Sequence, residues 1–436
     1  MAPGSRRRGL LEGERRLLVL LALVAVAAAA FRLPGLGYPG EEYFDEVYHA
    51  KTALEYLRGE PPTEWVHPPT AKLLIAIGVA LFGYEPWAWR LVPAVAGILL
   101  APVFLLLARR VLATERAALL ATTLLLLDGV YLVQSRVAMT NVFAVLFQVL
   151  SALFVLRAAV PGRLALGSMA AAGLALGLAL STRWTSLWAW GFLGLVFVVL
   201  RGRRALLARS EGEDPFEGFR ETSLLAMGFF VIPAAVYLLS YVPWMLQGHG
   251  VAEVVSLQKD IWSYHAGLTA THHYFSPWWT WPALYRPTWY FWWSDEHTIR
   301  GIVALGNPAI WWASVPAVLW ALGSGWRARD PRRLFAGAGF CLLYLPWGLA
   351  PRTLNFSHYL FEAIPYACLA LGMILDRAWE SRVGWTAGAA RVYLCVAAAL
   401  FVGFLPLLAA MPVPQPLWAF RFPWGPGLWT WFPSWI

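Results

Sequence analysis

The chain alternates long apolar runs with short charged segments. Eleven runs reach or approach the roughly 17–25 residues that a membrane-spanning helix needs. Because these runs are continuous and do not alternate, the strands of a membrane barrel do not explain them. We therefore predict an all-α polytopic membrane protein, with spans near residues 17–33, 88–108, 116–133, 140–158, 164–181, 185–200, 222–244, 302–322, 334–350, 357–375 and 386–410.

Basic residues gather on one side of this pattern. With the N-terminus in the cytoplasm, the inner segments carry 22 of the 34 Lys and Arg residues, as the positive-inside rule requires. An odd number of spans then places the C-terminus outside the cytoplasm. The run Leu17 to Phe31 could also belong to a signal peptide, with cleavage near Ala28-Ala29-Ala30; an uncleaved first helix fits equally well.

This orientation places two long loops, residues 34–87 and 245–301, outside the cytoplasm. We predict a single integral membrane domain, residues 1–436, in the cell membrane. Of the 436 residues, 59% are hydrophobic and 14% are charged, and the net charge of +9 is carried mostly by Arg at the ends of apolar runs. Arg at the ends of apolar runs indicates the orientation of membrane spans, so we expect no nucleic-acid partner. The three Cys lie inside predicted spans and have no disulfide or metal-ligand spacing.

The first long loop holds a dense group of charges beside the membrane. A helix is predicted over 43–57, ending at Gly59, with Asp45 and Glu46 in its first turn. The helix dipole keeps a carboxylate there ionised, as a general base requires. His49, four residues after Asp45, lies on the same face and could pair with it. The alternative, favoured by the local sequence alone, is a charge cap that faces water.

A second helix is predicted in the same loop. The run Leu73 to Phe82 is too short to span, so we expect it to lie in the plane of the interface. The prolines after His67 favour a helix start, and Lys72 falls in the first turn. Lys72 could bind a lipid phosphate, or its side chain could simply extend toward water along the helix surface.

Several other charged residues lie at the predicted outer face. Arg suits phosphate because its planar guanidinium bonds in pairs, so these cations could meet the acidic group, lipid headgroups or a phosphorylated substrate. They are Arg90, Arg136, Arg183 and Arg352, with Asp128 at the end of the third span.

The second long loop is rich in Trp, Tyr and His. The stretch from Gln258 to Trp293 could form an interfacial slab or a platform for sugar rings and a polyprenyl tail. His265, His272 and His273 lack zinc-ligand spacing, so we predict no metal.

Taken in order, several motifs resemble the protein O-mannosyltransferase family over most of the chain from residue 44 to about 370. They are F-D-E-V-Y-H-A-K (44–51), H-P-P-T-A-K (67–72), L-D-G-V-Y-L-V-Q-S-R-V-A-M (127–139), S-T-R-W-T (181–185), Y-H-A-G-L-T-A-T-H-H-Y-F-S-P-W-W-T-W-P (264–282), G-N-P-A-I-W-W (306–312) and F-S-H-Y-L-F-E-A-I-P (356–365).

The resemblance implies a class C glycosyltransferase fold with about eleven spans and interfacial helices in the first outer loop. It implies transfer of mannose from a polyprenyl phosphate to Ser or Thr of an exported protein, with inversion and without metal or cofactor. Asp45 matches the family's proposed base, and Glu46 matches the residue that shapes the acceptor site.

Further candidate contacts follow from the residues above. Candidates for the donor phosphate are Lys72, Arg90, Arg136, Arg183 and Arg352. Candidates for the acceptor or other substrate contacts are His49, His67, Asp128, His265 and His272. The expected partners are the lipid donor, the acceptor protein and membrane lipids, with the export machinery as a further candidate.

The chain departs from the family at two places. The family often has an acidic residue where this chain has Asn141, and the loop 245–301 is too short for the large lumenal insert of eukaryotic members. One alternative is a glycosyltransferase of the same fold that acts on a lipid or glycan acceptor. A transporter is the alternative from another class; it is less favoured because the polar residues gather at one face and the two halves do not match.

Overall fold

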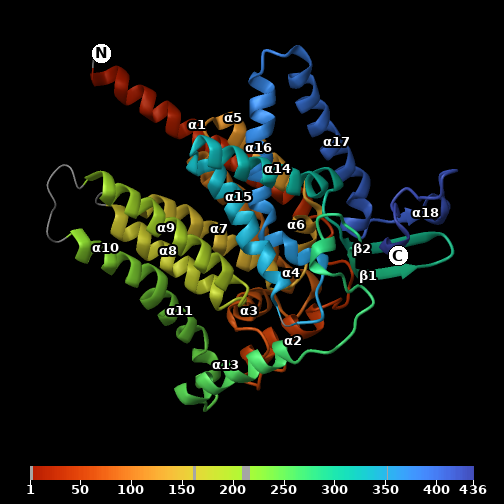
Figure 1. The fold of residues 1–436 in the computed structure, drawn as a ribbon. Coiled ribbons are helices and arrows are strands. Elements are labelled where there is room, and N and C mark those ends of the chain that lie inside the picture. Colours follow the sequence, from red (N-terminus) through yellow and green to blue (C-terminus); the bar gives the residue numbers. More distant parts are fainter. Residues whose placement is uncertain (1–2, 161–163, 209–216, 351) are drawn as a thin grey trace.

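The computed structural model describes residues 3–160, 164–208, 217–350 and 352–436. Helices make up most of the N-terminal half (Figure 1). They are α1 (Pro3–Arg32), α2 (Glu46–Arg58), α3 (Thr70–Phe82), α4 (Pro86–Val111), α5 (Glu115–Leu126), α6 (Gly129–Gln134), α7 (Asn141–Ala158), α8 (Leu164–Leu180), α9 (Ser186–Ala208), α10 (Glu217–Ala226), a π-helical turn (Met227–Val231), α11 (Ile232–Ser240), α12 (Val242–Met245) and α13 (Val251–Ala266).

The C-terminal half adds a small sheet to four further long helices. Its elements are β1 (Thr288–Ser294), β2 (Thr298–Ala304), α14 (Pro308–Ala328), α15 (Pro331–Tyr344), α16 (Ile364–Glu380), α17 (Gly384–Leu408), β3 (Val413–Pro414) and α18 (Gln415–Ala419). Short 3₁₀ turns lie at Trp278–Thr280, Leu345–Gly348, Ser357–Glu362 and Pro433–Trp435.

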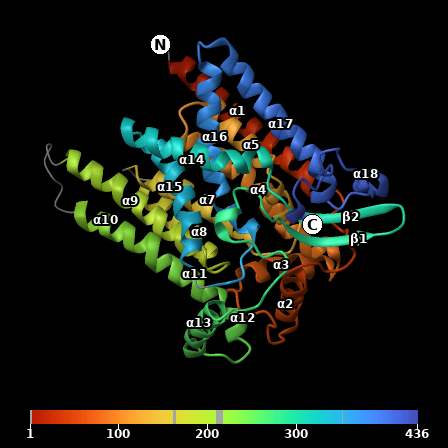
Figure 2. The ribbon, with the colours of Figure 1, turned by 45° about the vertical axis from the view of Figure 1, so that its right-hand side comes forward.

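Figures 1 and 2 show how these elements are arranged. The long helices pack beside one another, while α2, α3 and α13 gather at one end of the molecule, at the bottom of both views. The β1–β2 hairpin extends to one side. Segments from both long loops therefore meet at one end.

Four helices of the described chain are long and apolar enough to cross a membrane: Pro86–Val111, Asn141–Ala158, Thr222–Ser240 and Gly384–Leu408. Shorter apolar helices are Thr70–Phe82, Ala165–Leu180 and Ser186–Gly202. The helical membrane-protein class is confirmed at this level. The number of eleven spans stays a prediction.

Several predicted spans are interrupted, three of them at residues that explain the break. The span expected over 116–133 divides between α5 and α6, because Asp128 begins a new helix by accepting a hydrogen bond from the Tyr131 N–H at 2.9 Å. The span over 334–350 leaves the α-helix at Tyr344, since Pro346 follows and disfavours helix before it. The span over 357–375 begins as a 3₁₀ turn and becomes α-helical only at Ile364.

The all-α prediction is wrong for the second long loop and the tail. Strand β2 pairs antiparallel with both β1 and β3, and an irregularity between Trp289 and Phe291 bends the ladder. Aromatic residues favour strands. The turn is closed by Asp295, whose carboxylate accepts from the His297 and Thr298 N–H groups at 2.7 and 2.6 Å. The predicted span at 302–322 accordingly begins as strand.

Close packing fixes the short helices against the long ones. Gly78 of α3 lies so near α4 that a β-carbon there would come within 2.2 Å of the Ala88 carbonyl oxygen. Helix α2 ends as predicted at Gly59, whose left-handed conformation (φ +69°) lets its N–H bond back to the last turn. The end of the molecule that carries the charged residues is thus held by close packing of α3 against α4.

Candidate active site

Asp45 stands at a sharp turn before α2. The residue before it, Phe44, has a positive φ of 53°, which non-glycine residues adopt only when neighbouring contacts hold them there. Those contacts include Tyr290 of β1, whose ring stacks on the Phe44 ring with centroids 4.1 Å apart. The hairpin that the sequence did not predict therefore supports the turn that presents Asp45.

The Asp45 carboxylate is half-buried and does not cap its own helix. Within the described residues it has no hydrogen bond or ion pair. Burial raises the pKa of Asp45 to about 6; the nearby Glu64 charge adds to this, and the cations Arg183 and Arg352 act against it. A carboxylate that lacks protein partners and titrates near neutral pH can accept a proton.

Glu46 has the opposite character. It is buried, and its carboxylate accepts two hydrogen bonds from Arg90 Nε and one from Arg90 Nη2, at 2.8–3.2 Å, together with the Ala138 N–H at 2.9 Å. The remaining Arg90 donors bond to the carbonyl oxygens of Leu36, Pro39 and Glu41. All five N–H groups of Arg90 are thus occupied, so its geometry suits holding the first loop more than binding a phosphate.

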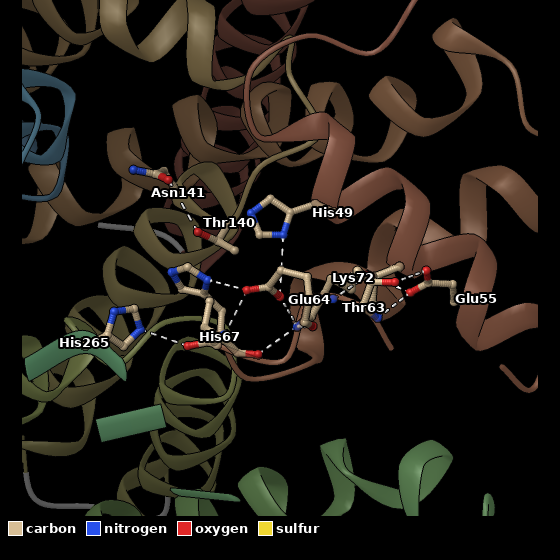
Figure 3. Close-up of polar contacts among 11 residues, drawn as sticks. His49, Glu55, Thr63, Glu64, His67, Lys72, Thr140, Asn141 and His265 are labelled. Atoms are coloured by element: carbon tan, nitrogen blue, oxygen red, sulfur yellow. Dashed lines mark hydrogen bonds and ion pairs between the residues drawn. The ribbon is translucent and has the colours of Figure 1, made fainter. Parts of the chain in front are cut away.

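Glu64 is the hub of a second buried group (Figure 3). Its carboxylate contacts His67 Nδ1 at 2.7 Å, the Lys72 ammonium, and His49 Nδ1 at 3.9 Å. Burial alone would raise its pKa, but Lys72 and His67 outweigh it and hold the pKa of the Glu64 carboxyl well below its usual range. Glu64 is not among the site residues predicted from the sequence. Its spacing of three residues to His67 and eight to Lys72 was the available signal.

This hub changes two sequence-based expectations. Lys72 is buried, and its ammonium bonds to the Glu64 carboxylate and to the carbonyl oxygens of Glu64 and His67, at 2.7 Å each for the carbonyls. The alternative in which its side chain extends toward water is therefore wrong. His49 faces Glu64, and the structure gives it no pairing with Asp45. Burial lowers the pKa of His49 to about 3, so this imidazole is neutral.

His265 of α13 joins the two long loops. Its Nε2 lies 2.9 Å from the Val66 carbonyl oxygen, which can only accept, so Nε2 carries the proton. Its Nδ1 is then free to accept from Arg352 Nη1 at 3.4 Å. Burial and the surrounding cations lower the pKa of His265 to about 4, which keeps this tautomer neutral. The His67 ring lies 5.3 Å away.

Two cations with unused donors remain near Asp45. Arg183 donates to Asn141 Oδ1 at 2.8 Å and lies 3.6 Å from Glu362, with its guanidinium 4.4 Å from the Tyr359 ring centroid. Arg352 also lies over Tyr359, at 5.8 Å, and donates from Nε to the Leu354 carbonyl oxygen at 2.7 Å. Within the described residues, neither guanidinium has partners for all five of its N–H groups.

The remaining candidates lie elsewhere or serve the fold. Arg136 donates to four carbonyl oxygens at the end of α1, those of Phe31, Arg32, Pro34 and Gly35. Asp128 is fully buried, and its carboxylate accepts from Trp311 Nε1 at 2.7 Å. His272 is exposed, and its ring lies 6.3 Å from the Phe44 ring, beside the Asp45 turn. Among the described residues, no group of three or more His, Cys, Asp or Glu side chains could hold a metal ion.

Comparison with known proteins relates this arrangement to one family. Residues 22–89 and 85–246 match the family described as "Dolichyl-phosphate-mannose-protein mannosyltransferase", and residues 250–422 match "C-terminal four TMM region of protein-O-mannosyltransferase". A "Polyprenol-phosphate-mannose--protein mannosyltransferase" of Mycolicibacterium smegmatis is 30% identical over 95% of this chain and 92% of its own length. The Mycobacterium tuberculosis protein of that name is 29% identical over 95% of this chain and 91% of its own length.

Solved structures agree at the level of the fold. A chain of the Saccharomyces cerevisiae protein O-mannosyltransferase Pmt1-Pmt2 complex, bound to the sugar donor, superposes with a TM-score of 0.80 at 16% identity, over 97% of this chain and 93% of that chain. ArnT from Cupriavidus metallidurans bound to undecaprenyl phosphate gives 0.56 at 19% identity, over 90% and 76%. The predicted fold is confirmed in this coarse sense.

Proposed function

The chain belongs to the protein O-mannosyltransferase family and is a glycosyltransferase, and we propose that it transfers mannose from polyprenyl-phosphate-mannose to Ser or Thr hydroxyls of exported proteins. The names of the mycobacterial relatives support both the donor and the acceptor class. The observation within the structure that carries the proposal is the Asp45 carboxylate, which lacks side-chain hydrogen bonds and ion pairs in the described chain and lies within electrostatic reach of Arg183 and Arg352.

Asp45 is the general base of this proposal. The acceptor oxygen attacks the anomeric carbon while Asp45 takes its proton. The bond between that carbon and the phosphate oxygen breaks, and its electron pair leaves with the phosphate. A single displacement of this kind inverts the anomeric centre. It needs no metal and no strong general acid, because the leaving group is a stable anion.

Arg183 and Arg352 are the proposed phosphate cations. Charge develops on the leaving phosphate as the bond breaks, and positioned donors stabilise that charge most when water is excluded. Both guanidiniums lie on the ring of Tyr359 and act electrostatically on Asp45. Lys72 and Arg90 are less suited to bind the phosphate, because their donors already bond to protein groups.

Arg136 and the candidate acceptor residues take other roles in this proposal. Arg136 holds the end of α1, and Asp128 holds α6 against α14. His49 and His67 belong to the Glu64 hub and position the floor of the site. His272, exposed beside Phe44, is the one we retain as an acceptor contact.

The proposed setting is a multi-pass protein of the cell membrane with a cytoplasmic N-terminus. The end that carries α2, α3 and α13 then faces away from the cytoplasm, where exported chains emerge. The basic residues of the opposite side support this orientation. The export machinery is a further proposed partner.

A transfer assay tests the function. Purified full-length protein is given labelled polyprenyl-phosphate-mannose with either a Ser/Thr-containing peptide or a lipid acceptor. We expect label on the peptide hydroxyl, with no requirement for divalent metal. Label found on a lipid or glycan acceptor, with none on the peptide, would replace the proposal with the alternative acceptor class.

A further inference from the structure

A groove of about 1130 Å³ lies between α4, α9 and α15, far from Asp45. Helix α4 begins beside the Glu46–Arg90 pair and ends at this groove, where Arg110 lines it. The twenty residues from Arg90 to Arg110 make about 30 Å of helix. The groove therefore opens at the opposite end of α4 from the candidate active site, and the two share no lining residue.

The wall of the groove is apolar and uncovered. Leu195 and Val199 of α9 both line it and are 55% and 49% exposed. Trp326, near the end of α14, is 79% exposed at its edge. Exposed apolar residues on membrane helices face hydrocarbon, and here they line a hollow in which an acyl chain can lie.

The rim of the groove is basic. Arg110, Arg327, Arg329 and Arg332 line it, and no acidic residue does. The carboxylate of Asp330, which follows Arg329 in the sequence, is paired with Arg333 at 3.2 Å. Among the described residues, the side chains of Arg327, Arg329 and Arg332 have no ion pair. The rim thus holds a surplus of positive charge at the ends of the apolar helices.

We propose that this groove binds an anionic phospholipid. Its acyl chain lies against Leu195 and Val199, and its phosphate lies among Arg327, Arg329 and Arg332. A phospholipid matches this arrangement, because its charged headgroup would lie at the ends of the helices and its hydrocarbon chain along their sides. Basic pockets between membrane helices bind anionic headgroups for the same electrostatic reason. The proposal does not depend on the sugar-transfer chemistry.

Lipid binding to the purified full-length protein tests the charge of the site. In neutral detergent, phosphatidylglycerol should raise the unfolding temperature, and phosphatidylcholine should not. The double variant Arg327→Gln/Arg332→Gln should bind phosphatidylglycerol at least roughly tenfold more weakly, since each Arg near a headgroup adds to the attraction. The control Arg382→Gln/Arg391→Gln removes the same charge from exposed positions outside the groove and should bind normally.

A second variant tests the apolar wall without changing any charge. Leu195→Trp should fill the groove and weaken phosphatidylglycerol binding. Leu187→Trp, similarly exposed on the same helix but outside the groove, should not. Transfer activity in neutral detergent should be unchanged in all these variants. Equal stabilisation by both lipids, the same effect from inorganic phosphate alone, preference for undecaprenyl phosphate, or undiminished binding by both groove variants would overturn the proposal.

Discussion

At the scale of single residues, Asp45 and Glu46 are neighbours with opposite surroundings. Glu46 is saturated by Arg90 and the Ala138 N–H, so its charge is fully committed to holding the loop. Asp45 has no protein partner of this kind within the described residues, and its pKa is raised to about 6. The sequence pairs the two as an acidic motif. Only the contacts separate a positioning carboxylate from one that can accept a proton.

The pH dependence of transfer follows from this difference. A base must be ionised, so activity should be level above about pH 7 and be lost as the pH falls through about 6, roughly tenfold per unit below that. The donor is a phosphodiester and does not titrate in this range, and the neutral His49 and His265 have pKa values near 3 and 4. Initial rates at saturating donor measure the profile. A level profile down to pH 5 would rule out Asp45 as the titrating base.

Glu64 should contribute to both stability and pH dependence. The variant Glu64→Gln keeps the shape of the side chain but leaves the buried Lys72 ammonium without its anion. The free energy of unfolding should therefore fall by about 3–5 kcal/mol. It also removes a negative charge near Asp45, so the midpoint of the pH profile should move to lower pH. Thermal unfolding and initial rates measure the two effects.

Two comparisons separate these effects from a general disturbance. The exposed Glu60→Gln should change neither quantity. The double variant Glu64→Gln/Lys72→Met, which removes both charges, should recover much of the lost stability. A pH midpoint that stays at the wild-type value in Glu64→Gln would mean that Glu64 does not act on the base.

At the scale of elements, most helices could be predicted because apolar runs and Gly or Pro stops fix them locally. Helix α2 begins within three residues of its predicted start and ends at Gly59, and α3 matches the short apolar run. The β1–β2 hairpin could not be predicted in this way. Its T-W-Y-F-W-W stretch has the same composition as an interfacial aromatic slab, and only pairing with a distant strand distinguishes the two.

The candidate site shows the same limit. The residue types and their end of the molecule could be predicted, but the partners of each cation could not. Arg90 forms an ion pair with Glu46, 44 positions away in the sequence, and Lys72 forms one with Glu64, 8 positions away. The donors of a buried cation are paired with whatever polar groups the fold brings near, and these partners lie far away in the sequence, so the sequence alone cannot say which cations keep donors for a phosphate.

The contact between α13 and the segment that joins α2 to α3 gives a prediction at this scale. His265 accepts from Arg352 and donates to the Val66 carbonyl oxygen, so it should position the Arg352 guanidinium. His265→Leu should raise KM for the donor severalfold with a smaller effect on kcat. His265→Asn, which retains an acceptor near the Nδ1 position, should restore part of the donor affinity. Equal loss in both variants, seen only in kcat, would contradict a positioning role.

At the scale of the whole molecule, the candidate active site and the basic groove lie at opposite ends. The carboxylates and candidate phosphate cations lie with α2, α3 and α13, while the basic groove lies at the far end of α4. The family places the chain among membrane glycosyltransferases, and four long apolar helices agree with that setting. Which end faces the cytoplasm is a separate question that depends on the charge bias.

Cysteine labelling tests this orientation. Trp424, in the C-terminal tail, and Trp385, in the first turn of α17, are both 73% exposed. In a background without the three native Cys, Trp424→Cys should react with a membrane-impermeant maleimide in intact cells. Trp385→Cys should react only after the membrane is opened. The reverse pattern would invert the proposed topology.

The most direct test of the proposed mechanism is the transfer activity of the variant Asp45→Asn. This change keeps the shape of the side chain and removes its ability to take a proton. Purified protein is loaded with labelled polyprenyl-phosphate-mannose, donor binding is measured, and a single turnover to a Ser/Thr peptide is followed. We predict retained donor binding and a loss of transfer of about 10²–10⁴-fold. Transfer within tenfold of the wild-type rate, with donor bound equally well, would contradict the assignment of Asp45 as the base.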